Sequence, residues 1–311
     1  MIIELHAKSD IGRVRGGNED NYLLLDLTTE KSWTCTNSAE SPADMSQLPV
    51  DHKGVVLAVS DGMGGALAGE VASRMSVETV RDVLLGANPD ITWDPETSAS
   101  LLDSLLRATI IANSEIHHLG QEEIQYNGMG ATFTGAAIKD ELIDFVQVGD
   151  SRGYLIRGDE IKQTTKDQSL VQQLIDVHQI SEEEAETHML RNVILQALGA
   201  QSEVTPVSCR VRVKRGDIML LCSDGLSGKL RASDILEIVL NNINDLSAAC
   251  SALVDEANAR GGEDNITVIL ARFLGDDLDE PSGERISVEL PSLEDDTTLG
   301  DLHETIPNGK V

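Results

Sequence analysis

Aromatic and basic residues are both scarce in this chain of 311 residues, and each shortage narrows what the protein can be. Phe, Trp and Tyr make up 3% of the sequence, so aliphatic side chains must fill its core. Lys and Arg number 24 against 53 Asp and Glu, which gives a formal net charge of −29. A surface this acidic repels nucleic acids and anionic membranes, and no basic cluster offsets it. We therefore expect neither a nucleic-acid partner nor a membrane partner.

Paired cysteines, a leader sequence and long apolar runs are also missing. Cys35, Cys209, Cys222 and Cys250 are scattered, and no C-x-x-C spacing indicates zinc or thiol redox chemistry. The first residues, MIIELHAKSD, contain acids and lack the apolar stretch of a signal peptide. No stretch approaches the ~18 apolar residues of a membrane span. These features predict a cytoplasmic protein with reduced thiols.

What the sequence does contain is a series of short apolar strands grouped between amphipathic helices. The expected strands cover residues 2–7, 21–27, 54–61, 130–139, 141–150, 152–161, 204–214, 217–224 and 265–273. The expected helices cover 66–85, 98–118 (closed by Gly120 as a C-cap), two pieces within 167–198, 233–241 and 245–260. Ser181 and Glu184 form the pattern of a capping box. Clustered strands covered by helices indicate an α+β fold with antiparallel sheets.

Two segments show no periodic pattern of apolar residues. Residues 28–53 are polar and contain prolines, which is typical of a long loop. Residues 274–311 hold eleven acidic and two basic residues, with three prolines and little apolar content. A segment of this composition cannot offset its ordering entropy, so we expect a disordered acidic tail. Its threonines Thr297, Thr298 and Thr305 stand among acids and are candidate sites of phosphorylation by a partner kinase.

Two similar acidic motifs lie near opposite ends of the chain. GGNEDN spans residues 16–21, and GGEDN spans residues 261–265. Each places adjacent acidic and amide side chains beside glycines, which allow the backbone to approach a ligand closely. Either motif alone is explained by a solvated loop. Their repetition favours a shared role in one site.

Three further aspartates follow apolar strands: Asp61 in SDGMGG, Asp150 in GDSRG and Asp224 in SDGLSG. Each is expected where a buried strand meets a tight turn. Taken singly, an Asp-Gly after a strand is most often a hairpin turn. Several carboxylates directed at one place repel one another unless cations lie among them. Oxygen ligands of this kind select Mg²⁺ or Mn²⁺, while the spacings of an EF-hand and of a P-loop are both absent.

The order of these motifs resembles that of a known enzyme family. RGGNEDN, SDGMGGALAGEVAS, GATFTGAAI, VGDSRGYLI, CSDGLSG and GGEDNITVIL occur in the order seen in metal-dependent protein phosphatases. This is the type 2C (PPM) family of serine/threonine phosphatases, and the chain resembles its bacterial members. The resemblance covers residues 5–273 and implies a phosphatase domain over 1–273. It implies a four-layer α-β-β-α sandwich, in which two antiparallel sheets are flanked by helix pairs.

The resemblance also implies a centre of two Mn²⁺ or Mg²⁺ ions. Asp61 would bridge the two ions, and the carbonyl of Gly62 would bind one of them. Asp224 and Asp264 would ligate the other. Asp150 matches the position that, together with Asp224, holds a third and weaker ion in bacterial relatives.

Four residues of the two end motifs complete the implied site. Glu19 would act through metal-bound water, and Asp20 would support the same group of ligands. Arg15 matches the arginine that grips the substrate phosphate. Asn265 would orient the loop that carries Asp264. In this family a hydroxide bridging the ions attacks phosphorus in line.

Two positions depart from the family pattern. Met63 stands where animal members carry a histidine proposed as general acid, and a thioether cannot donate a proton. Gln168 stands where relatives often have histidine, within a segment that resembles the family's flap, residues 158–200. These differences leave open the leaving-group acid and the binding of the third ion.

The function implied is hydrolysis of phosphoserine and phosphothreonine in proteins, in opposition to a bacterial Ser/Thr kinase. The partners would be that kinase and its phosphorylated substrates, and the family pattern favours a monomer. The alternative is a catalytically dead module of the same fold that only binds phosphoproteins. Such a module would be expected to lose one of Asp61, Asp224, Asp264 and Arg15, and all four are present.

Overall fold

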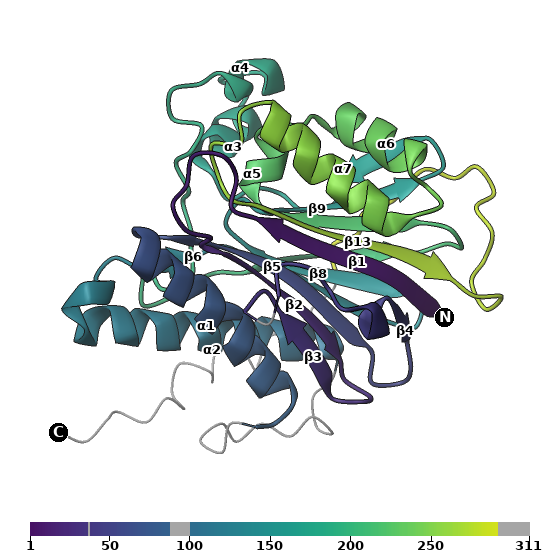
Figure 1. The fold of residues 1–311 in the computed structure, drawn as a ribbon, viewed down its shortest axis with the longest axis horizontal. Coiled ribbons are helices and arrows are strands. Elements are labelled where there is room, and N and C mark those ends of the chain that lie inside the picture. The colour runs from purple at the N-terminus through teal and green to yellow at the C-terminus, as the bar shows by residue number, and fades with distance from the viewer. Residues whose placement is uncertain (37, 88–99, 292–311) are drawn as a thin grey trace.

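Two antiparallel sheets lie face to face at the centre of the protein (Figure 1). The structure, a computed structural model, describes residues 1–36, 38–87 and 100–291. The first sheet has the order β10 (Glu160–Gln163), β9 (Arg152–Arg157), β12 (Ile218–Cys222), β13 (Ile266–Leu274), β1 (Ile2–Asp10) and β4 (Gln47–Pro49). Strands far apart in the sequence are therefore neighbours, since β1 pairs with β13 along its whole length.

The second sheet has the order β11 (Val207–Arg212), β8 (Leu142–Val148), β7 (Phe133–Lys139), β5 (Val55–Met63), β2 (Asp20–Asp26) and β3 (Lys31–Thr34). A two-residue strand, β6 (Gly130–Ala131), pairs with the end of β5. Two of the predicted strands are divided, because residues 152–161 contain the hairpin of β9 and β10 and residues 130–139 contain β6 and β7. The other predicted strands are present, with ends that differ from the expected ends by a few residues.

Alternation along the strands divides the aliphatic side chains between separate core layers. Ile3 and Leu5 of β1 and Leu24 of β2 are buried in the layer between the two sheets. Leu23 and Leu25 of β2 point the other way, into the layer beneath the helices. Because both faces of each sheet are covered, the strands are apolar on both sides, as their sequences indicated.

Two pairs of helices form the outer layers. On the second sheet lie α1 (Ala66–Leu84) and α2 (Leu101–Glu122), and on the first lie α6 (Ala232–Asn241) and α7 (Leu246–Ala259) (Figure 1). The α-β-β-α sandwich expected from the family resemblance is therefore confirmed. Within the described residues, no helix is both long and apolar enough to span a membrane.

The predicted end of α2 at Gly120 was wrong. Gly120 is buried inside the helix, which continues to Glu122. A β-carbon at this position would approach Met129 and the backbone of Tyr126. Gly120 therefore lies where the following chain packs closely on the helix, a role that local sequence does not distinguish from a cap.

The prediction of a long loop over residues 28–53 also needs correction. The segment contains β3, a single 3₁₀ turn η1 (Ala43–Met45) and β4, which extends the first sheet beside β1. Met45 and Leu48 are buried in the layer between the sheets. These two apolar anchors order the segment together with the partly buried Trp33, Cys35 and Val50 and the pairings of β3 and β4. The apolar residues are too few to produce a periodic pattern.

The segment resembling the family's flap is less regular than predicted. After β10 it contains α3 (Leu170–Asp176) and α4 (Glu182–Glu186), and the remainder up to residue 200 forms turns. The capping box at α4 is confirmed, because Ser181 and Glu184 each accept a hydrogen bond from the other's backbone N–H. The second predicted helical piece is only five residues long. Short helices of this kind are marginal without a buried face.

The expectation of disorder from residue 274 onward is wrong for residues 275–291. Leu278 and Ile286 are buried in the layer between the sheets. Glu289 and Arg210 of β11 exchange two backbone hydrogen bonds of 2.8 and 2.9 Å. The prediction failed because it used the average composition of the segment, which does not reveal two buried apolar residues and one strand-like backbone contact. The rest of the predicted tail, including its three threonines, lies outside the described residues.

Candidate active site

Asp20 and Asp61 face each other on neighbouring strands at one end of the sandwich. They are direct cross-strand partners in the pairing of β2 with β5. Asp61 was expected at a tight turn, but β5 continues past it to Met63 by changing its partner from β7 to β6. The carboxylate therefore sits on continuous strand, which restricts its motion more than a turn would.

Asp224 and Asp150 approach the same place from the other strands. Asp224 follows β12 and begins a one-turn helix, α5 (Asp224–Ser227), rather than the expected turn. Asp150 lies in the connection between β8 and β9, where its exposed fraction is 8%. Only this third aspartate has the predicted position at a tight turn. Burial and the charges of Asp20, Asp224, Asp150 and Asp264 raise the pKa of Asp61, and we call these five carboxylates the acidic cluster.

The two glycine-rich acidic motifs meet at this cluster, as their similarity suggested. The side-chain oxygen of Asn265 accepts a 2.8 Å hydrogen bond from the backbone N–H of Glu19. Its amide nitrogen donates to the carbonyls of Ile11 and Gly17 at 2.9 and 3.0 Å. Asn265 was expected to orient the loop of Asp264. Its three side-chain bonds hold the loop that carries Arg15 and Glu19, and its backbone N–H donates to Oδ1 of Asp264 at 2.9 Å.

Arg15 lies over the cluster with its guanidinium directed at acidic side chains. Its Nη2 is 2.8 Å from Oδ2 of Asp264, and its Nη1 is 3.9 Å from Oε1 of Glu19. The side chain of Arg15 is 46% exposed, so an anion arriving from solvent can reach it. The hydrogen bond and charge of Asp264 raise the pKa of Arg15. The guanidinium is therefore a permanent cation at the edge of the acidic cluster.

Glycines allow the backbone to pack closely around Glu19. The N–H of Gly62 donates to the carbonyl of Glu19 at 3.1 Å. A β-carbon at Gly62 would collide with the backbone carbonyl of Gly69 in α1. A β-carbon at Gly69 would in turn collide with the Glu19 carboxylate. The spacing of SDGMGGALAGE thus brings the first turn of α1 against the acidic cluster, and burial raises the pKa of Glu19.

Two hydroxyl groups that the sequence analysis missed hold Asp20 in place. Ser223 and Thr267 each donate a 2.7 Å hydrogen bond to Oδ2 of Asp20. Ser223 directly precedes Asp224, and Thr267 follows Asn265 by two positions. The repetition of Ser before Asp in both SDG motifs was the available signal. Which carboxylate a hydroxyl supports is decided by the packing of β2 against β12 and β13, and the pattern did not show it.

Burial makes the charged form of these carboxylates costly. Desolvation raises the pKa of Asp20 to about 7, although the bonds from Ser223 and Thr267 oppose the shift. Desolvation and neighbouring carboxylates raise the pKa of Asp150 to about 8 and that of Asp61 well above its usual value. The pKa of Asp224 is raised for the same reasons. Without a cation, the cluster favours protonation over charge.

Oxygen atoms in the cluster are left without protein partners. One Oδ1 atom on each of Asp20, Asp150 and Asp224 is buried and accepts no hydrogen bond. Buried polar groups are normally satisfied, so these three oxygens need a partner that the chain does not supply. All the candidate ligands are hard oxygen donors, a set that suits Mg²⁺ or Mn²⁺.

The same carboxylates do not form a preassembled cage. No group of three or more His, Cys, Asp or Glu side chains in the described residues has the arrangement of a ready-made metal site. The fit to a divalent ion rests on the oxygen-donor chemistry of the cluster and on its three unpartnered oxygens.

Residues 39–268 match the family described as Protein phosphatase 2C. The chain belongs to this family. Serine/threonine phosphatase stp of Listeria innocua is 35% identical over 272 residues, covering 86% of this chain and 95% of that protein. Protein phosphatase PhpP of Streptococcus pneumoniae is 39% identical over 225 residues, covering 72% of this chain and 88% of that protein.

Solved structures of bacterial phosphatases share the fold. The serine/threonine phosphatase PstP/Ppp of Mycobacterium tuberculosis aligns with a TM-score of 0.71 and 33% identity, covering 88% of this chain and 100% of that chain. The catalytic domain of PstP in complex with two manganese ions aligns with a TM-score of 0.68 and 32% identity, covering 88% of this chain and 99% of that chain. The recognition made from the six motifs is confirmed: this protein phosphatase 2C member is a phosphoprotein phosphatase of bacterial type.

Both departures from the family pattern lie beside the cluster. Met63 packs against Gly130, where a β-carbon would stand 2.8 Å from its Cε. A thioether at this place offers no proton to a leaving group. Gln168 contacts the turn that carries Asp150, because the backbone N–H of Gly149 donates to its Oε1 at 2.9 Å. The flap therefore contacts the turn that carries Asp150 through the neutral side-chain amide of Gln168.

Proposed function

We propose that this phosphatase hydrolyses phosphoserine and phosphothreonine in proteins with the help of two Mn²⁺ or Mg²⁺ ions. The observation that carries the proposal is the buried carboxylate cluster with its three unpartnered oxygens, together with the exposed guanidinium of Arg15, which binds Asp264. A cluster of carboxylates repels a phosphate unless bound cations offset the negative charge of the cluster. Family membership and relatives named serine/threonine phosphatases support the same reading.

The ligand set that we propose follows the structure of the cluster. Asp61 is paired across the strands with Asp20, and its carboxylate would be shared by both ions. The Gly62 carbonyl would serve one ion, while Asp224 and Asp264 would serve the other. Asp150, whose Oδ1 has no partner, would hold a third and weaker ion together with Asp224.

The two acidic residues after the first glycine pair would complete the ligand set through water. Glu19 is fixed by the bond from its N–H to Asn265 and by close packing against α1. Asp20 is fixed by Ser223 and Thr267, which leave its Oδ1 free to accept from a water in the shell. Preorganised groups of this kind cost little reorganisation during reaction.

The chain's own residues would bind and orient the phosphate. When bound, the two ions would supply an activated water and offset charge on the phosphoryl oxygens. Arg15 presents a planar group that can pair with two phosphate oxygens, and it would exchange its contact with Asp264 for the substrate. Met63 cannot protonate the departing alkoxide, so that proton must come from solvent or from a water in the site.

The test is hydrolysis of a phosphothreonine peptide and of p-nitrophenyl phosphate in the presence of Mn²⁺. We expect turnover that EDTA abolishes and Mn²⁺ restores. Asp61→Asn and Asp224→Asn should each lower kcat by ~10³-fold or more, because several kcal/mol of charge stabilisation are lost at 1.36 kcal/mol per tenfold. Asp255→Asn, at an exposed position of α7, is the matched control and should retain full activity. Undiminished turnover in Asp61→Asn would refute the ligand assignment.

The alternative, a phosphoprotein-binding module without activity, predicts a different outcome of the same assay. Such a module would bind the phosphothreonine peptide and release no phosphate at any Mn²⁺ concentration. The presence of the complete set Asp61, Asp224, Asp264 and Arg15 favours the enzyme. Peptide binding by fluorescence anisotropy, measured beside phosphate release, separates the two functions.

We further propose that the substrates are proteins phosphorylated by a Ser/Thr kinase of the same cell, and that the phosphatase acts as a cytoplasmic monomer. The acidic surface keeps identical copies apart through like-charge repulsion. Light scattering coupled to size-exclusion chromatography tests the monomer. Comparing the phosphoproteome with and without the active phosphatase tests the substrates.

A further inference from the structure

The turn that carries Asp150 is held from two sides. On the inner side, the Nε2 of Gln147 donates to the carbonyls of Gly149 and Ser151 at 3.1 and 3.0 Å. The hydroxyl of Ser151 is 2.6 Å from that of Thr132, which accepts from the N–H of Asp61. These contacts tie one side of the turn to the rigid strand of the cluster.

On the outer side, one residue of the flap occupies the turn with both its backbone and its side chain. The N–H of Gln168 donates to the carbonyl of Gly149 at 2.8 Å, and the N–H of Gly149 donates back to Oε1 of Gln168 at 2.9 Å. Gln168 therefore satisfies both backbone groups of the residue that precedes Asp150. Gly149 has a φ of +101°, a conformation that only glycine adopts readily.

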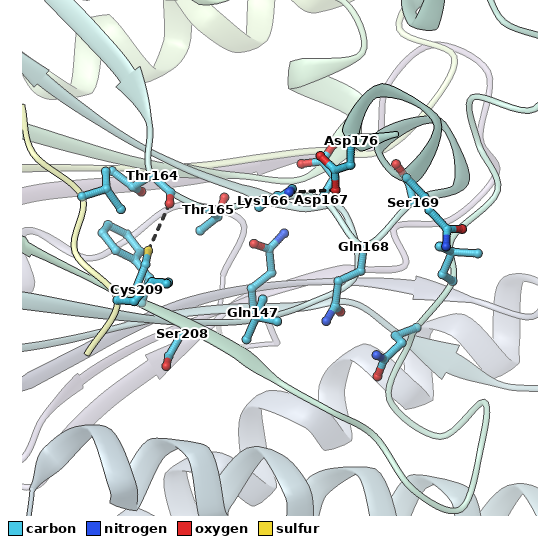
Figure 2. Close-up of a pocket in the computed structure, with 17 residues that line it drawn as sticks. Gln147, Thr164, Thr165, Lys166, Asp167, Gln168, Ser169, Asp176, Ser208 and Cys209 are labelled. Atoms are coloured by element: carbon cyan, nitrogen blue, oxygen red, sulfur yellow. Dashed lines mark hydrogen bonds and ion pairs between the residues drawn. The ribbon is translucent and has the colours of Figure 1, made fainter. Parts of the chain in front are cut away.

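Gln168 also holds the rest of the flap. Its Nε2 donates to the carbonyl of Thr205 at 3.0 Å, and its own carbonyl accepts from the N–H of Leu195 at 2.8 Å. All four of its polar groups are thus used, two toward the Asp150 turn, one toward Leu195 near the end of the flap and one toward Thr205 just beyond it. Gln168 and Gln147 line a cavity of about 540 Å³, whose wall also includes residues of β11. Figure 2 shows both side chains among the lining residues.

The residue before Gln168 also fastens the flap near the Asp150 turn. Asp167 receives three hydrogen bonds of 2.7–3.0 Å from Arg152, which stands two positions after Asp150. That ion pair lies on strand β9 and anchors the start of the flap to the first sheet. Gln168 then connects this ion pair to the backbone of Gly149.

We propose that Gln168 is a positioning residue, which sets the place of the Asp150 carboxylate and so couples the flap to the third, weakly held ion. This inference rests on the proposed function, because it concerns an ion of the proposed centre. Gln168 touches neither substrate nor ion and acts through the backbone of Gly149. Removing a group that orients a metal ligand typically lowers affinity by ~10–100-fold. The two ions shared by Asp61 should be unaffected.

The decisive variant is Gln168→Met, which keeps the length of the side chain and removes its two side-chain hydrogen bonds, to Gly149 and Thr205. In metal-free protein, we expect exchange of the Gly149 amide hydrogen to rise about tenfold or more, since its acceptor is lost. In Mn²⁺ titrations by calorimetry, the weakest site should lose about tenfold in affinity while the two tight sites keep theirs. Gln173→Ala, in α3 on the same cavity wall, is the matched control and should change neither quantity.

A conservative variant separates positioning from flap stability. Gln168→Glu keeps an acceptor for Gly149 and loses the donation to Thr205. It should restore protection of the Gly149 amide, although flap amides near Leu195 and Thr205 exchange faster. The proposal is overturned if Gln168→Met raises Gly149 exchange and leaves the weakest Mn²⁺ site unchanged, if Gly149 exchange stays at the wild-type rate, or if the wild type binds only two ions. Hydrogen exchange is measured without metal or substrate, so it tests the contact between Gln168 and Gly149 independently of catalysis. Absence of phosphatase activity would overturn the proposed function, and the two failures can be told apart.

Discussion

The acidic cluster and the flap lie next to each other, yet they are built on opposite principles. The cluster carries its charges on strands and on a closely packed helix start, where the side chains of Asp20 and Asp150 are almost fully buried. The flap consists of two short helices and turns, and it exposes apolar side chains such as Val177 and Met189, which is 86% exposed. One region stores unfavourable electrostatic energy in a rigid frame. The other has little buried surface to hold it in a single arrangement.

This difference indicates where each region gains its stability. The frame of the cluster is held by the sandwich core, so it tolerates repulsion that would unfold a loop. The flap depends on individual hydrogen bonds, notably those of Gln168 and Asp167. Changes in charge should therefore affect the cluster strongly, while changes in single bonds should affect the flap only locally.

The largest expected effect is on the stability of the metal-free protein as pH changes. Asp20 and Asp150 have folded pKa values of about 7 and about 8, well above those of an unfolded chain. The folded state thus binds more protons than the unfolded state between pH 4 and 8, so stability falls as pH rises through that window. We expect the Tm without metal to fall by several degrees from pH 5.5 to 8.5, at ~2–4 °C per kcal/mol. Saturating Mn²⁺ should remove this fall, and differential scanning calorimetry measures both.

A variant identifies the source of that pH dependence. Asp20→Asn keeps an oxygen that accepts from Ser223 and Thr267 and removes one buried charge. Its metal-free Tm should exceed that of the wild type at pH 8.5 and match it at pH 5.5. A metal-free wild type whose Tm rises steadily across this window would show that the carboxylates are not strained by burial.

A smaller effect is expected from Asn265→Ala, which breaks the link between the two end motifs. The change leaves the N–H of Glu19 and the carbonyls of Ile11 and Gly17 without their partner. Each unsatisfied buried group costs ~1–3 kcal/mol, so urea unfolding should show a loss of about 3 kcal/mol. Because Arg15 lies on the released loop, KM for a phosphopeptide should rise more than kcat falls.

The matched control for this change is Asn258→Ala in α7. Asn258 is buried to a similar degree but makes a single side-chain donation, to Asp10. It should lose about 1 kcal/mol of stability and leave KM unchanged. Equal shifts of KM in both variants would mean that Asn265 has no particular role in holding the Arg15 loop.

Much of the fold and of the site could be predicted from the sequence, because the apolar spacing marks the strands and helices and the repeated motifs mark the site residues. The strands and the four long helices show their apolar spacing directly, and the repeated Gly-Gly and acidic units predicted that Glu19 and Asp264 share a site. Segments with isolated anchors were missed, since Leu48 and Ile286 produce no period although each is buried between the sheets. Local patterns were reliable only where the contact itself is local, as at Ser181.

The supporting hydroxyls of the site could not be predicted for a physical reason. Thr267 and Ser223 reach Asp20 across strands that are more than two hundred residues apart in the chain. Their partner is set by how the sheet that contains β12 and β13 packs on the sheet that contains β2, and this packing is a property of the assembled sandwich. The sequence contains the donors, whereas the packing decides the acceptor.

The smallest expected effect is on the flap and comes from Ser181→Ala, which removes the capping box of α4. The lost hydroxyl accepted from the N–H of Glu184, and N-cap losses of this kind cost ~1 kcal/mol. Since α4 buries only Ala185, that cost should appear as faster hydrogen exchange over residues 182–186, with an unchanged global Tm. Ser181→Thr retains the acceptor and should exchange like the wild type. A drop of several degrees in global Tm for Ser181→Ala would show that the flap unfolds together with the sandwich, and the contrast between a rigid cluster and a locally held flap would then fail.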